Sequence, residues 1–96
     1  MNEKRWYVYI ITNYKNTVLY IGVTNNLQRR INEHRQGIGS QFSKKYRLYK
    51  LIWFEEFTSP LEAIATEKRL KGWRREKKVR LIEEKNPQWK DLSKMW

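Results

Sequence analysis

Two short stretches near the start of the chain are rich in aromatic and β-branched residues and predict a β-hairpin. They cover Trp6–Ile11 and Val18–Val23, and the polar segment that begins at Asn13 separates them. Such residues favour extended, pleated backbone, and two such runs joined by a short polar segment are typical of antiparallel strands. The same composition predicts a third strand at Leu51–Phe57.

Helices are predicted on either side of the third strand. Asn25 and Asn26 can cap a helix over residues 27–35 that ends at Gly37. The segment Ser59-Pro60-Leu61-Glu62 has the form of a capping box, so a second helix should run to about Lys71. A third should cover residues 75–84 and stop at Asn86-Pro87, whereas residues 37–41 have the composition of a flexible loop. The predicted fold is α/β, a small, three-stranded, mainly antiparallel sheet flanked by about three helices.

The length and composition predict one domain. A chain of 96 residues with 40% hydrophobic residues can form one core and not two. We expect a single domain over residues 1–96, with its core at about 6–86 and a C-terminal tail at 87–96 that either docks or stays loose. The chain has no cysteine and one histidine, His34, which excludes disulfides, cysteine zinc sites and paired-histidine catalysis.

The charge predicts a polyanionic partner. Lysine and arginine number 21 against 10 acidic residues, which gives a net charge of +11. Nucleic acid and anionic membranes both attract such proteins, but the apolar runs are far too short to span a bilayer. We therefore expect a cytoplasmic protein that binds nucleic acid and not membranes. The cations expected to contact it, some of them near Tyr46 and Tyr49, are Lys44, Lys45, Arg47, Lys50, Arg74 and Arg75.

Three polar side chains fall on helix faces that should be apolar. Arg30 and His34 lie beside the inward stripe of the first helix, and Glu67 lies in the middle of the apolar sector of the second, which includes Ile64. A carboxylate directed at a core must be neutralised, paired with a cation or bound to a metal. The alternatives are a structural salt bridge, for instance between Glu67 and Arg30, and a hydrogen-bonded core histidine.

The predicted hairpin adds hydroxyl groups on one face. Strand alternation places Tyr7 and Tyr9 together, and Tyr20 shares a face with Gly22 on the next strand. Tyr9 and Tyr20 should therefore face the same volume. Gly22 would permit close approach of another group to the backbone. Taken singly, tyrosines on a half-buried sheet are most often packing residues.

The ordered set of these residues resembles the GIY-YIG endonuclease family. Tyr9 precedes the intact Tyr20-Ile21-Gly22 motif by eleven residues, Arg30 and His34 follow it, and Glu67 lies on a helix after the third strand. The resemblance covers residues 6 to about 86 and is greatest to small stand-alone bacterial members.

The chain departs from the family pattern in three respects. Tyr7-Val8 stands in place of Gly-Ile in the first motif, and Val23 stands where the repair-incision members have a lysine. Asn86 corresponds to the late asparagine of the family, at a longer distance from Glu67.

The resemblance implies a metal-dependent endonuclease. Glu67 would hold one divalent cation, Mg²⁺ or Mn²⁺, and Arg30 would neutralise phosphate oxygens. Tyr20 or Tyr9 would be the base or would orient the water, and we favour Tyr20 with Tyr9 and His34 in support. The expected substrate is nucleic acid, DNA rather than RNA, cleaved with structure selectivity or weak sequence selectivity by a monomer or weak homodimer.

Two other functions remain open from the residues alone. A basic nucleic-acid-binding module could keep the nuclease fold without turnover, and its affinity would fall steeply with salt but survive EDTA. A protein-interaction domain would instead show negligible affinity for DNA or RNA at moderate salt.

Overall fold

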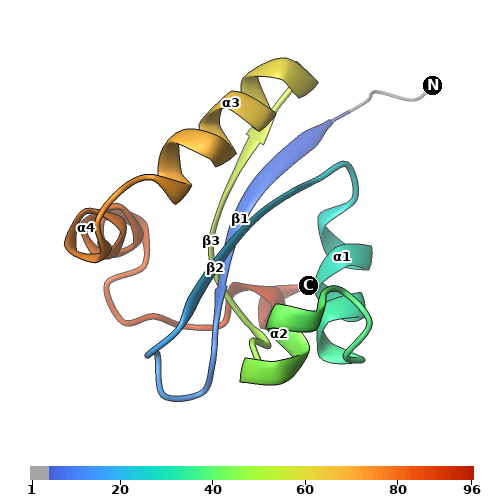
Figure 1. Ribbon diagram of the computed structural model, residues 1–96, viewed down its shortest axis with the longest axis vertical. Helices are drawn as coiled ribbons and strands as arrows, with labels where there is room; N and C mark the ends of the chain where they lie inside the picture. The colour runs from blue at the N-terminus through green and yellow to red at the C-terminus, as the bar shows by residue number, and fades with distance from the viewer. Residues whose placement is uncertain (1–4) are drawn as a thin grey trace.

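A three-stranded antiparallel sheet forms the centre of the computed structural model, which describes residues 5–96 apart from the Met95 side chain. Strand β1 (Trp6–Thr12) lies between β2 (Leu19–Thr24) and β3 (Lys50–Phe57). Helices cover both faces of this sheet (Figure 1). All three strands lie within a residue or so of the predicted positions, and the predicted fold class is confirmed.

Four α-helices and one short 3₁₀ helix follow the chain around the sheet. They are α1 (Leu27–Arg35), α2 (Gln41–Tyr46), α3 (Pro60–Lys71), α4 (Arg75–Lys85) and η1 (Leu92–Met95). The side chain of Asn26 accepts a hydrogen bond from the Arg29 N–H at the start of α1, and Ser59 accepts one from Glu62 at the start of α3. These caps hold two of the predicted helices in place.

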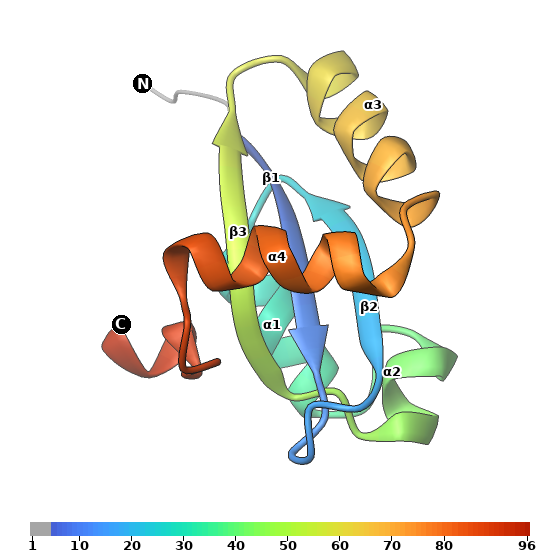
Figure 2. The same cartoon turned by 90° about the vertical axis from the view of Figure 1, so that its left-hand side faces the viewer.

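Alternation along β1 divides the interior into two clusters. Val8 and Ile10 pack with Ile52, Trp53 and the apolar sides of α3 and α4. Tyr9 and Ile11 point the opposite way and pack against α1 and the start of β3. Figure 2 shows α4 crossing the first of these faces. The two predicted tyrosines therefore lie on the α1 side of the sheet.

The segment after α1 differs from its prediction. Residues 41–46 form α2, a helix of 6 residues. The sequence had not predicted this helix, because residues 37–41 have the composition of a loop. The Ser40 side chain caps its first turn by accepting from the Ser43 N–H. Arg47 ends the helix in the left-handed region, with φ of 57°. The flank therefore holds four α-helices where about three were expected.

The buried face of α3 also differs from the prediction. Ala63, Thr66 and Leu70 are its buried residues, whereas Ile64 is exposed. The helix is rotated from the expected sector because the small side chains of Ala63 and Thr66 allow close contact with the sheet. Glu67 consequently sits at the margin of the buried face instead of its middle.

The C-terminal tail docks on the domain. Asn86 is buried and donates from Nδ2 to the Ile52 and Lys90 carbonyl oxygens, each at 2.9 Å. Asp91 accepts from the Leu51 N–H at 3.2 Å and pairs with Arg35 at 3.0 Å. Of the two alternatives left by the sequence, docking is therefore observed. Within residues 5–96, no helix has the length and apolar character needed to cross a membrane.

Candidate active site

Gly22 allows the Tyr9 ring to lie over the neighbouring strand. Tyr9 and Gly22 are paired across β1 and β2, and both are buried. A Cβ atom built at Gly22 would lie 2.3 Å from the Tyr9 hydroxyl and 2.5 Å from Cζ, which is too close for any side chain. The glycine of the Tyr-Ile-Gly motif therefore positions the first tyrosine.

His34 receives the Tyr9 side chain from α1. The Tyr9 hydroxyl lies 2.9 Å from Nε2 of His34, and the second ring nitrogen, Nδ1, lies 2.7 Å from the Ser43 hydroxyl on α2. His34 is completely buried. Gly39 packs against the imidazole so closely that an added Cβ would be 2.4 Å from Nδ1. The ring is thus fixed on three sides.

The hydrogen bonds around Ser43 allow us to infer a tautomer of His34. If Ser43 donates its one hydroxyl hydrogen to the Ser40 carbonyl oxygen at 3.2 Å, its oxygen accepts from Nδ1–H at 2.7 Å. Nε2 then lacks a hydrogen and accepts from the Tyr9 hydroxyl. The guanidinium of Arg30 is close enough to lower the pKa of the same phenol. In this arrangement the Ser43 hydroxyl, the Nδ1–H of His34 and the Tyr9 hydroxyl each have one acceptor.

Burial keeps both members of the Tyr9–His34 pair neutral. Burial, followed by the nearby positive charge of Arg30, lowers the pKa of His34 to about 4. Burial also raises the pKa of Tyr9 to about 12, because its effect outweighs the opposing influence of Arg30, and the nearby Tyr20 and Glu67 add smaller upward contributions. The proton therefore stays on the phenol, and the pair acts as a fixed hydrogen bond.

Tyr20 is the phenol that remains available. Its ring centroid lies 5.5 Å from that of His34 and 6.4 Å from that of Tyr9, and Phe42 stacks on it at 5.9 Å. Tyr20 is half-buried, and its hydroxyl has no hydrogen-bond partner among residues 5–96. The prediction that both tyrosines face one volume is correct.

Arg30 supplies a positive charge at the mouth of this cluster. Its guanidinium pairs with Glu33 at 3.0 Å, and its side chain is 32% exposed. Burial opposes the charged form, but the hydrogen bonds to Tyr9 and Glu33 outweigh it and raise the pKa of Arg30. The guanidinium is therefore charged at any working pH and partly open to an anionic ligand.

Glu67 lies on α3 near the cluster and pairs with a lysine of its own helix. Its carboxylate pairs with Lys71 at 2.7 Å, whereas Arg30 pairs with Glu33. Of the alternatives left open by the sequence, a salt bridge is observed, but its partner is Lys71 and not Arg30. The charge of Glu67 nevertheless acts on the Tyr9 hydroxyl, and its side chain is 13% exposed.

The residues present fit a hydrated divalent cation. No group of three or more acidic or histidine side chains in residues 5–96 could form a complete protein cage for a metal. Mg²⁺ commonly binds through one or two carboxylates and keeps several waters. Glu67 can supply one such carboxylate because its partner Lys71 is on the helix surface and can move away.

Other predicted residues lie outside this cluster. Asn86 joins α4 to β3 and the tail, which is a structural role. Arg75 donates to the Asn16 and Thr17 carbonyl oxygens on the hairpin turn, and Arg74 is exposed at the start of α4. The remaining predicted nucleic-acid contacts lie on α2, or between it and the start of β3, and are Lys44, Lys45, Arg47 and Lys50.

Sequence reasoning missed three contributors to the site. Gly39 and Ser43 hold His34, and Phe42 covers Tyr20. Ser40, a good helix cap directly after Gly39, indicates the start of the short helix α2. Gly37 and Gly39 nevertheless favoured a loop in the prediction.

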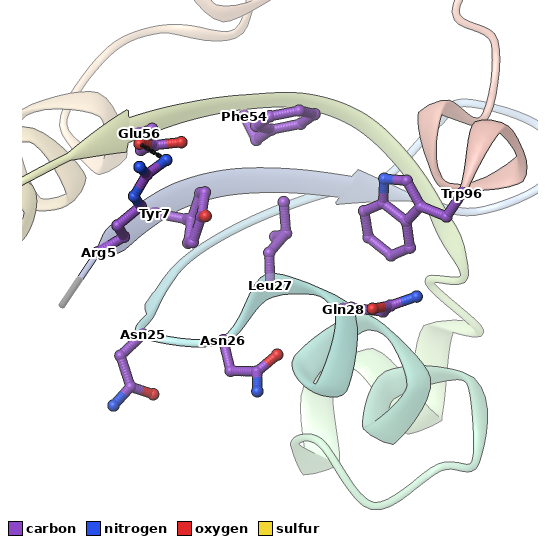
Figure 3. Close-up of a pocket in the computed structure, with 9 residues that line it drawn as sticks. All are labelled: Arg5, Tyr7, Asn25, Asn26, Leu27, Gln28, Phe54, Glu56 and Trp96. Atoms are coloured by element: carbon purple, nitrogen blue, oxygen red, sulfur yellow. Dashed lines mark hydrogen bonds and ion pairs between the residues drawn. The ribbon is translucent and has the colours of Figure 1, made fainter. Parts of the chain in front are cut away.

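An open pocket of about 610 Å³ lies on the same face of the sheet (Figure 3). Tyr7, Phe54 and Trp96 line it together with the amide side chains at the start of α1. It contains none of the five predicted catalytic residues.

Comparisons with known proteins agree with this geometry. Residues 5–80 match the GIY-YIG catalytic domain. The chain is 38% identical over 79 residues to a UPF0213 protein of Staphylococcus haemolyticus, covering 82% of this chain and 95% of that one. It is 39% identical over 80 residues to a UPF0213 protein of Clostridium perfringens, with coverage of 83% and 85%.

A solved structure shows the same fold. The solution NMR structure of a UPF0213 protein from Bacillus halodurans aligns with a TM-score of 0.59 and 29% identity, over 94% of this chain and 95% of that chain. The domain match and the UPF0213 relatives confirm the resemblance seen in the sequence. The chain belongs to the GIY-YIG family.

Proposed function

We propose that the protein is a metal-dependent endonuclease that hydrolyses phosphodiester bonds in nucleic acid, preferentially DNA. One observation carries the proposal. A phenol without a hydrogen-bond partner, Tyr20, stands beside a rigid neutral pair, Tyr9–His34, and the charged Arg30. This arrangement offers a water-orienting group next to a cation that matches phosphate oxygens.

Tyr20 is the group that handles the attacking water. Its hydroxyl is free to accept a hydrogen bond from that water and, when ionised, to take its proton. The water oxygen forms the new bond to phosphorus while the bond to the leaving ester oxygen breaks. Tyr9 and His34 position the Tyr20 ring, because the neutral pair has no proton to accept or release near pH 7.

Arg30 neutralises the negative charge of the phosphate directly, and Glu67 does so through a bound cation. The planar guanidinium can donate two parallel hydrogen bonds to non-bridging oxygens as negative charge develops. Glu67 would hold Mg²⁺ or Mn²⁺ once Lys71 moves aside. A bound cation would supply Lewis-acid stabilisation of the same phosphate.

A cleavage assay with matched variants tests the proposal. Nicked, branched and single-stranded DNA and RNA are incubated with the protein and Mg²⁺ or Mn²⁺. Arg30→Ala should lower the cleavage rate by about 10²–10³-fold, and Glu67→Gln should abolish metal-dependent cleavage. The matched control is Arg29→Ala, because Arg29 neighbours Arg30 but is more exposed and pairs with the same Glu33. Cleavage that both site variants leave unchanged would contradict the proposal.

A second candidate is a binding module without turnover. The ion pair between Glu67 and Lys71 favours it, because a carboxylate held by lysine has no need of a metal. This function predicts no cleavage of any substrate and an affinity for nucleic acid that EDTA and Glu67→Gln leave unchanged.

A further inference from the structure

A row of aromatic rings leads away from Tyr20 along α2. Phe42 stacks on Tyr20 with an angle of 29° between the rings, and Tyr46 follows with its centroid 4.8 Å from that of Phe42. Phe42 and Tyr46 are both exposed. They lie one helical turn apart, so they form a continuous apolar track on the surface of α2.

The track ends in a pocket between the hairpin turn and the start of β3. This pocket has a volume of about 470 Å³. Its lining residues are Asn13, Tyr14, Lys15, Tyr46, Arg47, Tyr49 and Lys50. Tyr14 is 89% exposed, so its ring is available to a ligand. Figure 1 shows α2 and the turn between β1 and β2 at the same end of the sheet.

We call the aromatic track and this pocket together the tyrosine groove. Its aromatic members are Phe42, Tyr46, Tyr14 and Tyr49, and its lining cations are Lys15, Arg47 and Lys50.

All charged side chains of the tyrosine groove are positive. The segments that form it, residues 13–18 and 40–50, contain no aspartate or glutamate, and Lys44 and Lys45 add to the three lining cations. None of these five cations pairs with a carboxylate of residues 5–96. An uncompensated cluster of this kind attracts phosphates.

Local hydrogen bonds hold the groove in shape. Lys50 donates to the Asn16 side chain at 2.7 Å, and Arg75 donates to the Asn16 carbonyl oxygen at 2.8 Å. The Asn13 side chain accepts from the backbone N–H groups of Thr17 and Val18 at 2.8 and 3.1 Å. The hairpin turn is therefore hydrogen-bonded to β3 and α4, and these bonds fix the position of the backbone that carries Tyr14.

We propose that the tyrosine groove binds an unpaired strand of nucleic acid, with bases stacked on the rings and phosphates beside the cations. Exposed aromatic rings stack on bases of any sequence, which matches a surface without base-reading geometry. Bases in a duplex are already stacked on one another and are not available to these rings. The cations alone would bind either form, so the rings are what select an unpaired strand.

The position of the groove gives it a use in cleavage. Phe42 contacts Tyr20 directly, so a strand stacked along α2 continues towards the candidate catalytic centre. This part of the inference rests on the proposed function. The binding itself does not, because it needs neither metal nor turnover.

Binding of labelled oligonucleotides in EDTA tests the groove without cleavage. Fluorescence anisotropy compares a single strand of about 12 nucleotides, the corresponding duplex and an abasic strand of equal length. We expect the single strand to bind more tightly than both at equal salt. Tyr14→Ala and Tyr46→Ala should each weaken single-strand binding by about 5- to 150-fold, corresponding to ~1–3 kcal/mol per stacked base.

Matched variants separate stacking from folding and from charge. Tyr46→Phe keeps the ring and should restore binding, and Tyr14 is so exposed that its replacement cannot disturb the core. Trp96→Ala removes an exposed aromatic ring from the other pocket and should have no effect. Equal affinity for the abasic strand, or a loss caused by Trp96→Ala in place of the two tyrosine variants, would overturn the proposal.

The outcome for the groove is independent of the outcome for the nuclease. Metal-dependent cleavage with unchanged affinity in Tyr14→Ala and Tyr46→Ala would reject the groove and keep the enzyme. Ring-dependent binding without cleavage of any substrate would reject the enzyme and keep the groove.

Discussion

The Tyr9 hydroxyl touches groups from two elements, Gly22 on β2 and His34 on α1, and Arg30 on α1 acts on it as well. Because each contact is close, a change of one methyl group there has a large effect. The residues of the cluster are therefore more sensitive to shape than to charge.

Replacement of Gly22 tests this sensitivity. Gly22→Ala places a methyl group 2.3 Å from the Tyr9 oxygen, so the phenol must leave His34. We expect a loss of about 1–3 kcal/mol in the free energy of unfolding, measured by urea denaturation. Gly72→Ala is the control, because its nearest contact would be an ordinary 3.6 Å and its φ is −82°. Equal stability of the two variants would contradict the packing described here.

Ser43 is predicted to set the tautomer of the one histidine in the chain. With the Ser43 hydroxyl bonded to the Ser40 carbonyl oxygen, Ser43 accepts from Nδ1–H, so ¹⁵N NMR of the imidazole should show Nδ1 protonated and Nε2 unprotonated near pH 7. Ser43→Ala removes the acceptor and should shift the spectrum towards a mixture of tautomers. An Nε2–H signal in the unaltered protein would reverse the direction of the Tyr9 hydrogen bond.

The low pKa of His34 predicts a pH-dependent stability. Its pKa is about 4 in the folded protein against an ordinary value of 6.5, so the unfolded chain takes up a proton first as pH falls. The stabilisation is complete above pH 6.5 and is lost between pH 6.5 and 4, by about 3 kcal/mol. His34→Gln should flatten this part of a urea-midpoint profile. A wild-type profile that is already flat there would contradict a neutral buried histidine.

At the level of elements, the sequence predicted what local signals determine. The helices α1 and α3 begin at strong caps, Asn26 and Ser59, and the strands have clear β composition. The helix α2 has only 6 residues, which is too short for a hydrophobic period to appear. Its role depends on contacts with His34 and Tyr20, which are distant in sequence.

The same limit applies to the candidate site. Strand alternation predicted that Tyr9 and Tyr20 share a volume, and helix spacing placed Arg30 and His34 beside the inward stripe. That the two pairs meet was implied by the family resemblance. The spacing of Glu67 and Lys71 permits an i,i+4 pair, but the predicted apolar sector of α3 directed Glu67 at the core, so its pairing depended on the rotation of α3. The buried face includes Ala63 and Thr66, a small and a polar residue that give a weak apolar signal in the sequence.

Asn86 links elements and should contribute to stability. Asn86→Ala leaves the carbonyl oxygen of Ile52 and the backbone of Lys90 without their partner, which should cost about 1–3 kcal/mol. Asn32→Ala is the control, because Asn32 is exposed on α1 and alanine favours helix. Thermal unfolding of both variants measures the difference. Equal melting temperatures would show that the tail is not anchored through Asn86.

At the scale of the whole molecule, a net charge of +11 predicts strongly salt-dependent binding. The logarithm of the association constant should fall linearly with the logarithm of salt concentration. Lys15→Ala should reduce the slope by about 1, since Lys15 lines the tyrosine groove, whereas Lys90→Ala on the docked tail should not. Equal slopes for the two variants would indicate diffuse attraction by the whole surface.

Because β1 is the central strand, the candidate site persists as long as the whole sheet stays folded. This strand is hydrogen-bonded on both sides, and its amides should exchange with deuterium only when all three strands separate. Tyr9 is carried by the same backbone, so partial opening cannot remove it while the rest of the sheet persists. Destabilisation anywhere in the domain would therefore reduce the fraction of competent molecules without changing the rate of each.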